Sequence, residues 1–313
     1  MSVDIGGTFT DLLITSGNKI IAALKVSTTP GNPEKGVMEA IRKSGIKRFE
    51  EMVHATTIGT NTLLGQYGLD IPKIALITTK GFSDVIEIGR QNRPSLYDLR
   101  FQRPRTLVVR KHRYEVTERT NVSGKIEQPL NKEDLIRIVD RLKKESIRSV
   151  AVSFLHSYLN PKNEKEAYEL IKDYVPYVTL SSSIAPEPRE FERTSTSVVN
   201  AVLTPVFVQY LKTLKDDIST YGNPSMSVMS NSGGLISHEE AMSKPVAVIE
   251  SGPAAGVIAS NEFAKQVGIT DLISFDMGGT TAKAGTVLNN TIEITTEYEV
   301  GGSSLQWIMA PSC

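Results

Sequence analysis

Two short segments of this chain share one pattern, and that repetition limits the folds open to the chain. The segments are VDIGGTFTDLLI at residues 3–14 and FDMGGTTAKAGTV at residues 275–287. Each reads as an apolar strand that carries an aspartate and runs into a Gly-Gly-Thr turn. Glycines lack Cβ atoms, so such a turn can bring main-chain N–H groups close to a bound anion. The copies lie too far apart for a solenoid, whose units recur every ~20–50 residues, so they indicate two similar hairpins.

The aspartates of the two segments, Asp4 and Asp276, restrict what the hairpins can bind. A carboxylate repels a phosphate, so an aspartate beside a phosphate-binding turn requires a divalent cation or its waters between them. We therefore expect Asp4 and Asp276 to hold a hydrated metal while the turns grip a polyphosphate from opposite sides. A plain β-turn that starts with Asp explains one segment alone, but two copies matched position by position favour the phosphate site.

Other signatures of phosphate, metal or nucleophilic sites are missing from the sequence. It contains no G-x-x-x-x-G-K-[ST], G-x-G-x-x-G, G-x-S-x-G or H-E-x-x-H motif. Its four histidines have no ligand spacing, and its single cysteine, Cys313, allows neither a disulfide framework nor a cysteine-based metal centre. The repeated hairpins therefore carry most of the chemical information.

Charge and hydropathy narrow the class of protein further. The chain has 35 basic and 35 acidic residues, and this balance argues against nucleic acid or an anionic membrane as the main partner. It has no run of about 18 apolar residues that could span a membrane. A signal peptide has a basic segment followed by an apolar one, and the start of this sequence shows no such pattern. We therefore expect a cytoplasmic protein that binds a small molecule.

Strand and helix patterns alternate along most of the chain, which predicts an α/β protein with a substantially parallel sheet. We expect strands at residues 3–5, 12–14, 19–26, 52–55, 73–78, 149–154, 177–180, 225–229, 246–250 and 272–276. Helical spacing predicts helices at residues 33–44, 58–64, 130–144, 164–174, 192–219 and 253–267. Residues 89–105 are rich in Arg and Pro and have no period, so they are expected to form a long loop.

The chain is long enough for two domains. Residues 181–188 have mostly small side chains and include proline, which is typical of a linker. We therefore divide the chain into an N-terminal domain, 1–185, and a second domain, 186–313. Each would carry one hairpin. Only a short stretch follows Asp276, whereas a typical domain has ~100–200 residues. We therefore expect a truncated second domain.

Several further blocks occur with the hairpins in a characteristic order. Together they resemble the hydantoinase A/5-oxoprolinase family of ATP-dependent cyclic-amide hydrolases, which belongs to the actin/hexokinase ATPase superfamily. The resemblance implies a ribonuclease-H-like, actin/hexokinase-type ATPase domain followed by the incomplete start of a second one. The blocks are VHATTIGTNTLL (53–64), ALITTKGFSDVIEIGRQNRPSLYDL (75–99), AVSFLHSYLNPKNE (151–164), PEPREFERTSTSVVNA (186–201), SNSGGLIS (230–237) and SGPAAGVIAS (251–260).

The resemblance implies a reaction in which ATP, with Mg²⁺, phosphorylates the amide oxygen of a hydantoin, 5-oxoproline or related ring. Water can then open the activated ring. Asp4, Asp276 and Asp11 would be catalytic, with the metal held through water by Asp4 and Asp276. The residues expected to contact ATP are Gly6, Gly7, Thr8 and Thr10 from the first hairpin and Gly278, Gly279, Thr280 and Lys283 from the second.

Lys283 departs from the pattern, because many relatives have Asp at this place where the first hairpin has Asp11. A lysine could reach a phosphate as a point charge or remain solvated. Residues 252–256 form a small-residue turn at a predicted helix start, suited to anion binding or, more often, to close packing.

Substrate contacts are expected from two polar segments. His54, Thr57 and Asn61 lie in a hydroxyl-rich turn between a strand and a helix, although one threonine there would serve only as a helix cap. Arg90 lies in the predicted loop and could bind a substrate carboxylate, face a partner subunit or remain solvated. The resemblance also implies a second, hydantoinase B-type subunit or domain.

Three alternatives stay open beside the cyclic amidase. The chain could be the ATP-using subunit of an acetone-type carboxylase, a non-catalytic fragment of either enzyme, or a small-molecule kinase with the same hairpins. The tail GGSSLQWIMAPSC (301–313) leaves the family pattern, so we expect this polypeptide to lack the family reaction on its own.

Overall fold

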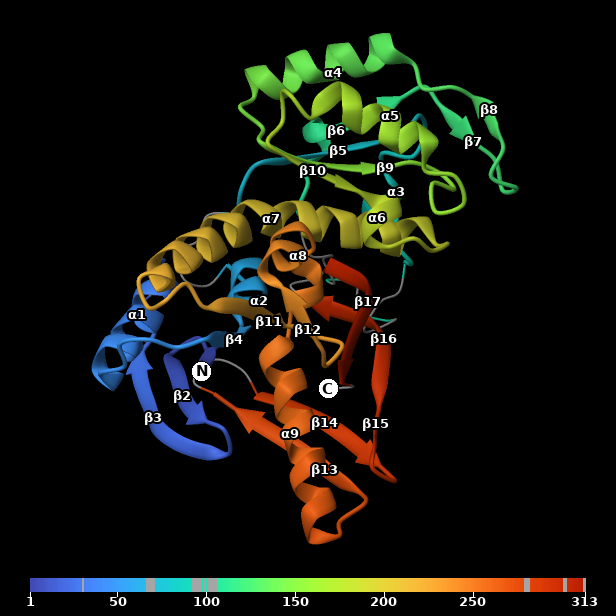
Figure 1. Cartoon of the computed structure of the whole chain (residues 1–313). Coiled ribbons are helices and arrows are strands. Elements are labelled where there is room, and N and C mark those ends of the chain that lie inside the picture. The colour runs from blue at the N-terminus through green and yellow to red at the C-terminus, as the bar shows by residue number, and fades with distance from the viewer. Residues whose placement is uncertain are drawn as a thin grey trace. The chain divides into compact units, whose positions relative to one another are not determined.

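The computed structural model covers the whole chain and describes residues 1–29, 31–65, 71–91, 97, 100, 106–278, 282–300 and 303–311 (Figure 1). The chain forms two compact, discontinuous units. Unit 1 contains Met1–Asp70, Val206–Tyr298 and Ile308–Cys313, and unit 2 contains Ile71–Pro205 and Glu299–Trp307. The units differ from the linear division at 185/186, because the chain leaves unit 1 after its first four strands and returns to it later.

Unit 1 is built around a six-stranded mixed sheet in the order β12-β11-β4-β1-β2-β3. The first three strands form an antiparallel meander, whereas β4 is parallel to β1 and β11 is parallel to β4. The strands are β1 (Ser2–Ile5), β2 (Phe9–Ser16), β3 (Lys19–Ser27), β4 (Glu51–Thr56), β11 (Ser225–Met229) and β12 (Leu235–Ser237).

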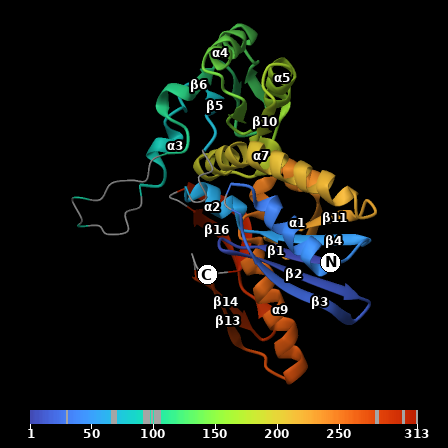
Figure 2. The same cartoon turned by 90° about the vertical axis from the view of Figure 1, so that its left-hand side faces the viewer.

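Helix α1 (Pro33–Ser44) covers the meander, as Figure 2 shows. Pro33 fits the first helical turn, where its missing N–H is not needed. Gly45 ends the helix in the left-handed region, with a φ of 72°. The buried side chains Val37 and Ile41 lie on one face of the helix, and that face packs on the apolar side of the hairpin. The helix predicted at 33–44 is confirmed.

A second sheet of unit 1 holds the second hairpin. It has the order β13-β14-β15, with β13 (Leu272–Met277) antiparallel to β14 (Ala282–Leu288), and β15 (Thr291–Ile292) at its edge. Helix α9 (Ser251–Val267) packs on this sheet. Two more strands, β16 (Ile294–Val300) and β17 (Ser303–Pro311), pair with each other.

One strand prediction in unit 1 is wrong. Residues 246–250 do not form a strand, because Pro245–Val248 is a 3-10 helix between α8 (His238–Ser243) and α9. Asn231 bonds this turn twice, since its amide group donates to the Val246 carbonyl and its backbone N–H to the Ala247 carbonyl. Backbone groups that are bonded in a turn are not available to a sheet.

Unit 2 contains a four-stranded sheet that is entirely parallel, in the order β10-β9-β5-β6. Figure 1 shows two helices, α4 (Lys132–Lys144) and α5 (Lys162–Ile171), on one face of this sheet. The N-terminal part of α7 (Glu190–Ser219) lies on the other face, where the Ser149 hydroxyl donates to the Ala201 carbonyl. The strands are β5 (Ile74–Thr79), β6 (Arg113–Val116), β9 (Ser149–Ser153) and β10 (Tyr177–Leu180).

The remaining elements of unit 2 are short. Residues 181–188, expected to be a linker, begin instead with a helical turn whose first residue, Ser181, is buried and donates to the Glu164 carboxylate. The short elements are α3 (Val85–Ile88), a 3-10 turn (Arg110–His112), β7 (Arg119–Thr120), β8 (Ile126–Gln128) and α6 (Ser181–Ile184). One further helix, α2 (Ile58–Leu63), belongs to unit 1.

No helix in the described part of the chain is both long and apolar enough to cross a membrane.

The core of unit 2 forms between the sheet and its two covering helices. Strand β9 is buried at every position, as expected for a parallel strand covered on both faces. Helix α4 contributes an apolar stripe that includes Leu135 and Leu142. Its N-terminus is capped by Asn131, whose side chain accepts a bond from the Asp134 N–H.

Neighbouring positions on α4 provide a matched test of this packing. Leu135 is 0% exposed and Ile136 is 58% exposed. We expect Leu135→Ala to reduce the free energy of unfolding by about 2–5 kcal/mol, because it leaves a cavity in the core. Ile136→Ala should change it by less than about 0.5 kcal/mol. Urea unfolding followed by circular dichroism measures both, and equal losses would contradict this assignment of the buried face.

Candidate functional site

Both glycine-rich hairpins belong to unit 1. In the first, β1 and β2 are joined by a turn in which the Gly6 N–H donates to the Phe9 carbonyl at 2.9 Å. Asp4 lies opposite Asp11 in this ladder, and Asp276 lies opposite Lys283 in the second. The ladders therefore match in register, but one position carries a negative charge in the first hairpin and a positive charge in the second.

Asp4 lies in a crowded acidic environment. It is exposed at the surface, yet the protein around it removes enough hydration to raise its pKa to about 6. The repulsion from Asp11 and Asp276 adds to this increase, and Lys25 opposes it. Because Asp276 acts on Asp4 electrostatically, the fold brings the acidic residues of the two hairpins into one site.

Asp11 is partly neutralised by the next strand. Its carboxylate forms an ion pair with Lys25 on β3 at 2.9 Å, and both side chains are exposed. The same ammonium lies over the Phe9 ring at 5.2 Å from its centroid. Exposed pairs of this kind contribute little to stability, so Lys25 mainly adjusts the local charge beside Asp4.

The start of α9 adjoins Asp4. A Cβ atom placed on Gly252 would lie 3.4 Å from the Asp4 carboxylate, so a larger side chain would fill the space beside that group. The neighbouring Ser251 is buried, and its hydroxyl bonds the Thr56 carbonyl at the end of β4. The small-residue turn thus both packs closely and places a helix N-terminus next to an acidic site.

A buried carboxylate links this helix to the second hairpin. Glu250, in the left-handed region with a φ of 60°, precedes α9 and is buried. It accepts a bond from the Thr60 hydroxyl at 2.8 Å and forms an ion pair with Lys283 at 3.1 Å. In this structure Lys283 is therefore paired with a carboxylate, and it is mostly buried rather than solvated.

The turn residues of the first hairpin have different surroundings. Gly6 and Gly7 are partly exposed and Thr8 is exposed, as a phosphate-binding turn requires. Thr10 is fully buried, and its hydroxyl bonds that of Thr28 at 3.1 Å. Its burial contradicts the expected phosphate contact. Thr10 stabilises the Gly-Gly-Thr turn indirectly, because the Thr28 hydroxyl to which it bonds also donates to the Gly6 carbonyl.

In the second hairpin, Gly278 is exposed at the end of β13, as is Asp276. Gly279 and Thr280 lie outside the described residues. Their expected phosphate contacts therefore stay predictions.

The structure contradicts the expectation that His54 contacts substrate. Its side chain is fully buried, with Nδ1 3.3 Å from the Val3 carbonyl and Nε2 2.8 Å from the Tyr210 hydroxyl. Burial lowers its pKa to about 4, so the ring is neutral at pH 7. Since the carbonyl can only accept, Nδ1–H donates to it and the tyrosine hydroxyl donates to Nε2. His54 joins β4 to α7.

Thr57 and Asn61 support the end of β1. The Thr57 hydroxyl donates to the Ile5 carbonyl at 3.1 Å, and the Asn61 amide donates to the Thr57 hydroxyl at 2.9 Å. Thr57 is partly exposed, whereas Asn61 is buried. The burial of Asn61 argues against direct substrate contact, so these residues act by positioning the strand that carries Asp4.

Arg90 belongs to unit 2, and its guanidinium binds the Glu192 carboxylate in a two-pronged ion pair. Glu192 lies in the first turn of α7 and its side chain is almost fully buried. Arg189 lies 3.8 Å from the same carboxylate, so two guanidinium groups compensate the charge of buried Glu192.

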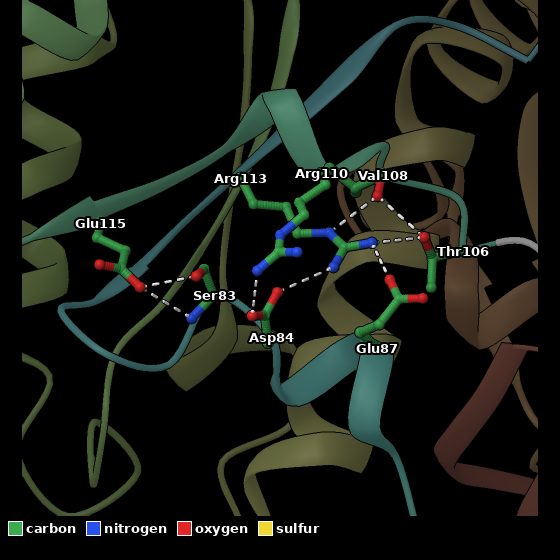
Figure 3. A network of polar contacts seen from close by, with 8 residues as sticks. All are labelled: Ser83, Asp84, Glu87, Thr106, Val108, Arg110, Arg113 and Glu115. Carbon is green, nitrogen blue, oxygen red and sulfur yellow. Dashed lines mark hydrogen bonds and ion pairs between the residues drawn. The ribbon is translucent and has the colours of Figure 1, made fainter.

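A polar network also in unit 2 fastens the two sides of the segment that follows Arg90 (Figure 3). The buried Arg113 guanidinium donates to Glu87, on the helix before the segment, and to Thr106, just after it, at 2.7 Å each. Arg110 binds Asp84 in the same way, and Ser83 binds Glu115. The network therefore joins residues 83–87 to residues 106–115, which lie before and after this connection in the chain.

The described residues contain no group of three His, Cys, Asp or Glu side chains close enough to hold a metal ion between them. Burial, and in addition repulsion from the Asp11 and Asp276 carboxylates, nevertheless disfavours charge on Asp4. A hydrated divalent cation would relieve that repulsion, so the donor set fits a cation held through water.

Sequence reasoning missed Glu250, and it singled out Gly252 without placing it beside Asp4. Both lie in or beside the quoted block SGPAAGVIAS, and an acidic residue directly before a small-residue helix start is the signal that was available. Their partners come from distant segments, so the sequence alone could not show which groups they face.

Two family models match this chain. The model for the hydantoinase/oxoprolinase N-terminal region matches residues 1–175, and the hydantoinase/oxoprolinase model matches residues 193–309. The chain belongs to the hydantoinase/oxoprolinase family. This confirms the resemblance found from the ordered sequence blocks.

The chain is similar in sequence to one protein without a named activity and to others whose named activities differ. An uncharacterized protein of Methanocaldococcus jannaschii, MJ0964, is 50% identical over 308 residues, covering 96% of this chain and 45% of that protein. The acetophenone carboxylase gamma subunit of Aromatoleum aromaticum is 30% identical, covering 93% and 43%. 5-Oxoprolinase 1 of Arabidopsis thaliana is 31% identical, covering 97% and 26%. The chain thus spans less than half the length of each.

Solved structures confirm the actin/hexokinase-type α/β fold. The ATP-dependent caprolactamase of Pseudomonas jessenii superimposes with a TM-score of 0.84 at 26% identity, over 98% of this chain and 46% of that one. Nucleotide-free acetone carboxylase gives a TM-score of 0.80 at 22% identity, over 97% and 46%.

The acidic cluster predicts an unusual titration. The Asp4 carboxyl should titrate near pH 6, and Asp11→Asn should lower this midpoint because it removes one repelling charge. Since the folded-state pKa exceeds the unfolded value, the stabilising contribution of Asp4 protonation is greatest below about pH 3.8 and is lost as the pH rises through 6. Carbon-13 NMR of the aspartate carboxyls measures the midpoint. Asp216→Asn is the control, and an Asp4 midpoint near 4 would contradict the prediction.

The Glu250–Lys283 pair predicts a stability difference. Lys283→Met leaves the buried Glu250 carboxylate without this ammonium and should reduce the free energy of unfolding by about 3–5 kcal/mol. Lys265→Met, which removes the exposed pair with Glu262, should cost less than about 1 kcal/mol. Chemical unfolding compares the two, and the double variant E250Q/K283M should recover part of the loss. Equal effects at both lysines would refute a special role for the buried pair.

Proposed function

We propose that the site between the two hairpins binds the phosphates of Mg-ATP. The observation that carries this proposal is the matched register of the two hairpins of unit 1, each of which places an exposed aspartate directly before its glycine turn. The raised pKa of Asp4, caused by burial and by the charges of Asp11 and Asp276, agrees with it. A site that concentrates carboxylates beside an exposed glycine turn suits a metal–phosphate group better than a free anion. Relatives described as ATP-dependent support it.

The proposal assigns separate roles to the residues of unit 1. Asp4 and Asp276 hold the hydrated cation and orient its waters, and Asp11 adds negative charge on the same side. Main-chain N–H groups at Gly7 and Thr8 hold phosphate oxygens, while Gly6 shapes the turn, since its own N–H donates to the Phe9 carbonyl. Corresponding groups at Gly278, Gly279 and Thr280 hold them from the other hairpin. Lys283 contributes indirectly, since its pairing with Glu250 fixes the strand that carries Asp276.

We infer that the complete enzyme uses ATP to open a cyclic amide of the hydantoin or 5-oxoproline type. An unstrained amide is a poor electrophile. Its oxygen attacks the γ-phosphorus and ADP leaves, so the ring carbon becomes open to water. Water adds to this carbon and the ring C–N bond breaks, which leaves an acyl phosphate and a free amine. A second water then displaces the phosphate from the acyl group, which completes hydrolysis. Relatives named 5-oxoprolinase and caprolactamase support this reaction class.

A carboxylase is the second candidate, favoured by the 30% identity to an acetophenone carboxylase subunit. ATP would then activate a ketone and bicarbonate instead of an amide. ATP hydrolysis stimulated by hydantoins, as opposed to ketones with bicarbonate, separates the two. Two relatives are named as subunits, so we also propose a second, hydantoinase B-type subunit or domain as partner.

If a cation lies between Asp4 and the phosphates, a mutation of Asp4 should have opposite effects on ATP affinity with and without magnesium. Asp4→Asn should weaken binding of Mg-ATP at least tenfold, because it removes a ligand of the hydrated metal. With ATP in EDTA the same substitution should leave binding unchanged or strengthen it, because it removes a charge that repels phosphate. Isothermal titration of the purified chain measures both.

The matched control is Asp216→Asn on α7, an exposed aspartate outside the proposed site. It should bind Mg-ATP as the parent chain does. The proposal fails if the parent chain does not bind Mg-ATP at millimolar concentration, or if Asp4→Asn weakens binding equally with and without magnesium.

A further inference from the structure

The four strands of the unit 2 sheet run in the same direction, so their carboxyl ends lie along one edge. The chain forms β5 first, then adds β6 on one side of it and β9 and β10 on the other. The direction in which strands are added therefore reverses between β5 and β9. In open parallel sheets, ligands bind outside the carboxyl ends of the strands at such a point.

This edge of the sheet is polar although it is buried. Thr79 ends β5, and the buried residues Glu118, Ser157 and Ser181 come shortly after β6, β9 and β10. The Thr79 hydroxyl donates to the Glu118 carboxylate, and the Ser157 and Ser181 hydroxyls bond each other at 3.0 Å. Buried polar groups need partners of this kind, because they have lost their water.

A second carboxylate in this network is satisfied by uncharged donors. Glu164 on α5 is 0% exposed. Its oxygens accept from the Phe154 N–H at 2.9 Å, the Ser181 hydroxyl at 2.6 Å and the Ser182 N–H at 2.9 Å. Glu164 therefore does not need a cation in direct contact with it.

Arg193 brings a positive charge to the same network. It lies in the first turn of α7 and is 1% exposed. Its Nη1 donates to the Ser157 hydroxyl at 2.6 Å, but its Nε is buried without a hydrogen-bond partner. Among the described residues, Glu164 and Glu190 act on this guanidinium only through space, and none forms an ion pair with it. A buried charge in this state is costly unless an anion joins it.

Arg90 shows how a guanidinium is satisfied elsewhere in unit 2. Its Nε and Nη2 donate together to the two oxygens of Glu192. The corresponding edge of Arg193 makes no hydrogen bond to the described residues. This planar pair of donors matches the two oxygens of a carboxylate. Arg193 therefore has an unused edge of the shape that binds a carboxylate.

Tyr158 covers the Arg193 guanidinium and is itself partly exposed. The centre of its ring lies 5.4 Å from the guanidinium carbon. The Tyr158 hydroxyl is 3.4 Å from His156 Nδ1, which is long for a hydrogen bond and holds the ring weakly. Exposed side chains change rotamer rapidly, so rotation of this ring gives a small molecule a path to Arg193.

We propose that Arg193 anchors a binding site for a small organic acid at the carboxyl edge of the unit 2 sheet. Its Nε and Nη2 donate to the two oxygens of the acid's carboxylate, and Tyr158 turns aside to admit the acid. A monocarboxylate suits the site better than phosphate, because Glu164 and Glu190 oppose a second negative charge. The proposal does not rest on nucleotide binding at the hairpins.

The test titrates the purified chain by calorimetry with acetate, L-5-oxoproline, pyrrolidin-2-one and inorganic phosphate. Pyrrolidin-2-one has the ring of 5-oxoproline without its carboxylate. At least one of the two acids should bind with a millimolar or lower Kd, and pyrrolidin-2-one should bind at least tenfold more weakly than that acid. Tighter binding of 5-oxoproline than of acetate supports a ring acid as the ligand, and the reverse supports a simpler acid.

A matched pair of substitutions locates the site. Arg193→Lys keeps the positive charge but removes the planar pair of donors, so it should weaken binding of the acid at least tenfold. Arg141→Lys, at an exposed position on α4, is the control and should bind as the parent chain does. Circular dichroism verifies that both variants keep the parent fold. The proposal is overturned if neither acid binds, if phosphate binds more tightly than both, or if Arg193→Lys binds as well as the parent.

A second readout does not depend on the folding of Arg193→Lys. Nitrogen-15 NMR follows the arginine Nε–H signals of the parent chain. The acid should shift one of them and slow its exchange with water, because a donor without a partner gains an acceptor. Without acid, Tyr158→Leu should move the same signal, since it removes the ring that lies over Arg193. The proposal also fails if no arginine signal responds to the acid, or if Tyr158→Leu leaves the responding signal in place.

Discussion

The structure of unit 1 depends on the parallel pairing of β4 with both β1 and β11. Strand β1 begins the chain and β11 comes after Ile71–Pro205, the larger segment of unit 2, so this pairing returns the polypeptide to its first sheet. The buried His54–Tyr210 hydrogen bond ties β4 to the helix that makes the return. Only because of that return can Ser251 reach the end of β4, and only then does the start of α9 lie beside Asp4.

Electrostatic asymmetry distinguishes two hairpins that are otherwise built alike. Asp11 and Lys283 occupy matching positions, and each is paired with an opposite charge, Asp11 with exposed Lys25 and Lys283 with buried Glu250. The first pair adjusts charge at the surface, whereas the second anchors a strand. The acidic side of the site therefore centres on Asp4, whose pKa is raised by burial and then by the charges of Asp11 and Asp276.

Much of the architecture could be predicted because local patterns and the ordered motifs agree with it. The helix over residues 33–44, the family and three of the four parallel strands of unit 2 were predicted correctly, whereas β6 (Arg113–Val116) was not predicted. Residues 246–250 were predicted as a strand, but Pro245–Val248 is a 3-10 helix, and Asn231 donates to its Val246 carbonyl. Thr10 was assigned to ligand contact from the family resemblance and His54 from its place in a polar turn, and the structure buries both side chains.

The chemistry of the site follows from residue types and spacing alone: an aspartate before Gly-Gly-Thr, repeated once, can be recognised in the linear chain because all its parts are adjacent. Which charges surround Asp4, which carboxylate pairs with Lys283 and which donor of Arg193 lacks a partner depend on contacts between segments up to hundreds of positions apart. Burial and electrostatic interaction depend on distance in space, and that distance is set only when the sheet and its helices pack together.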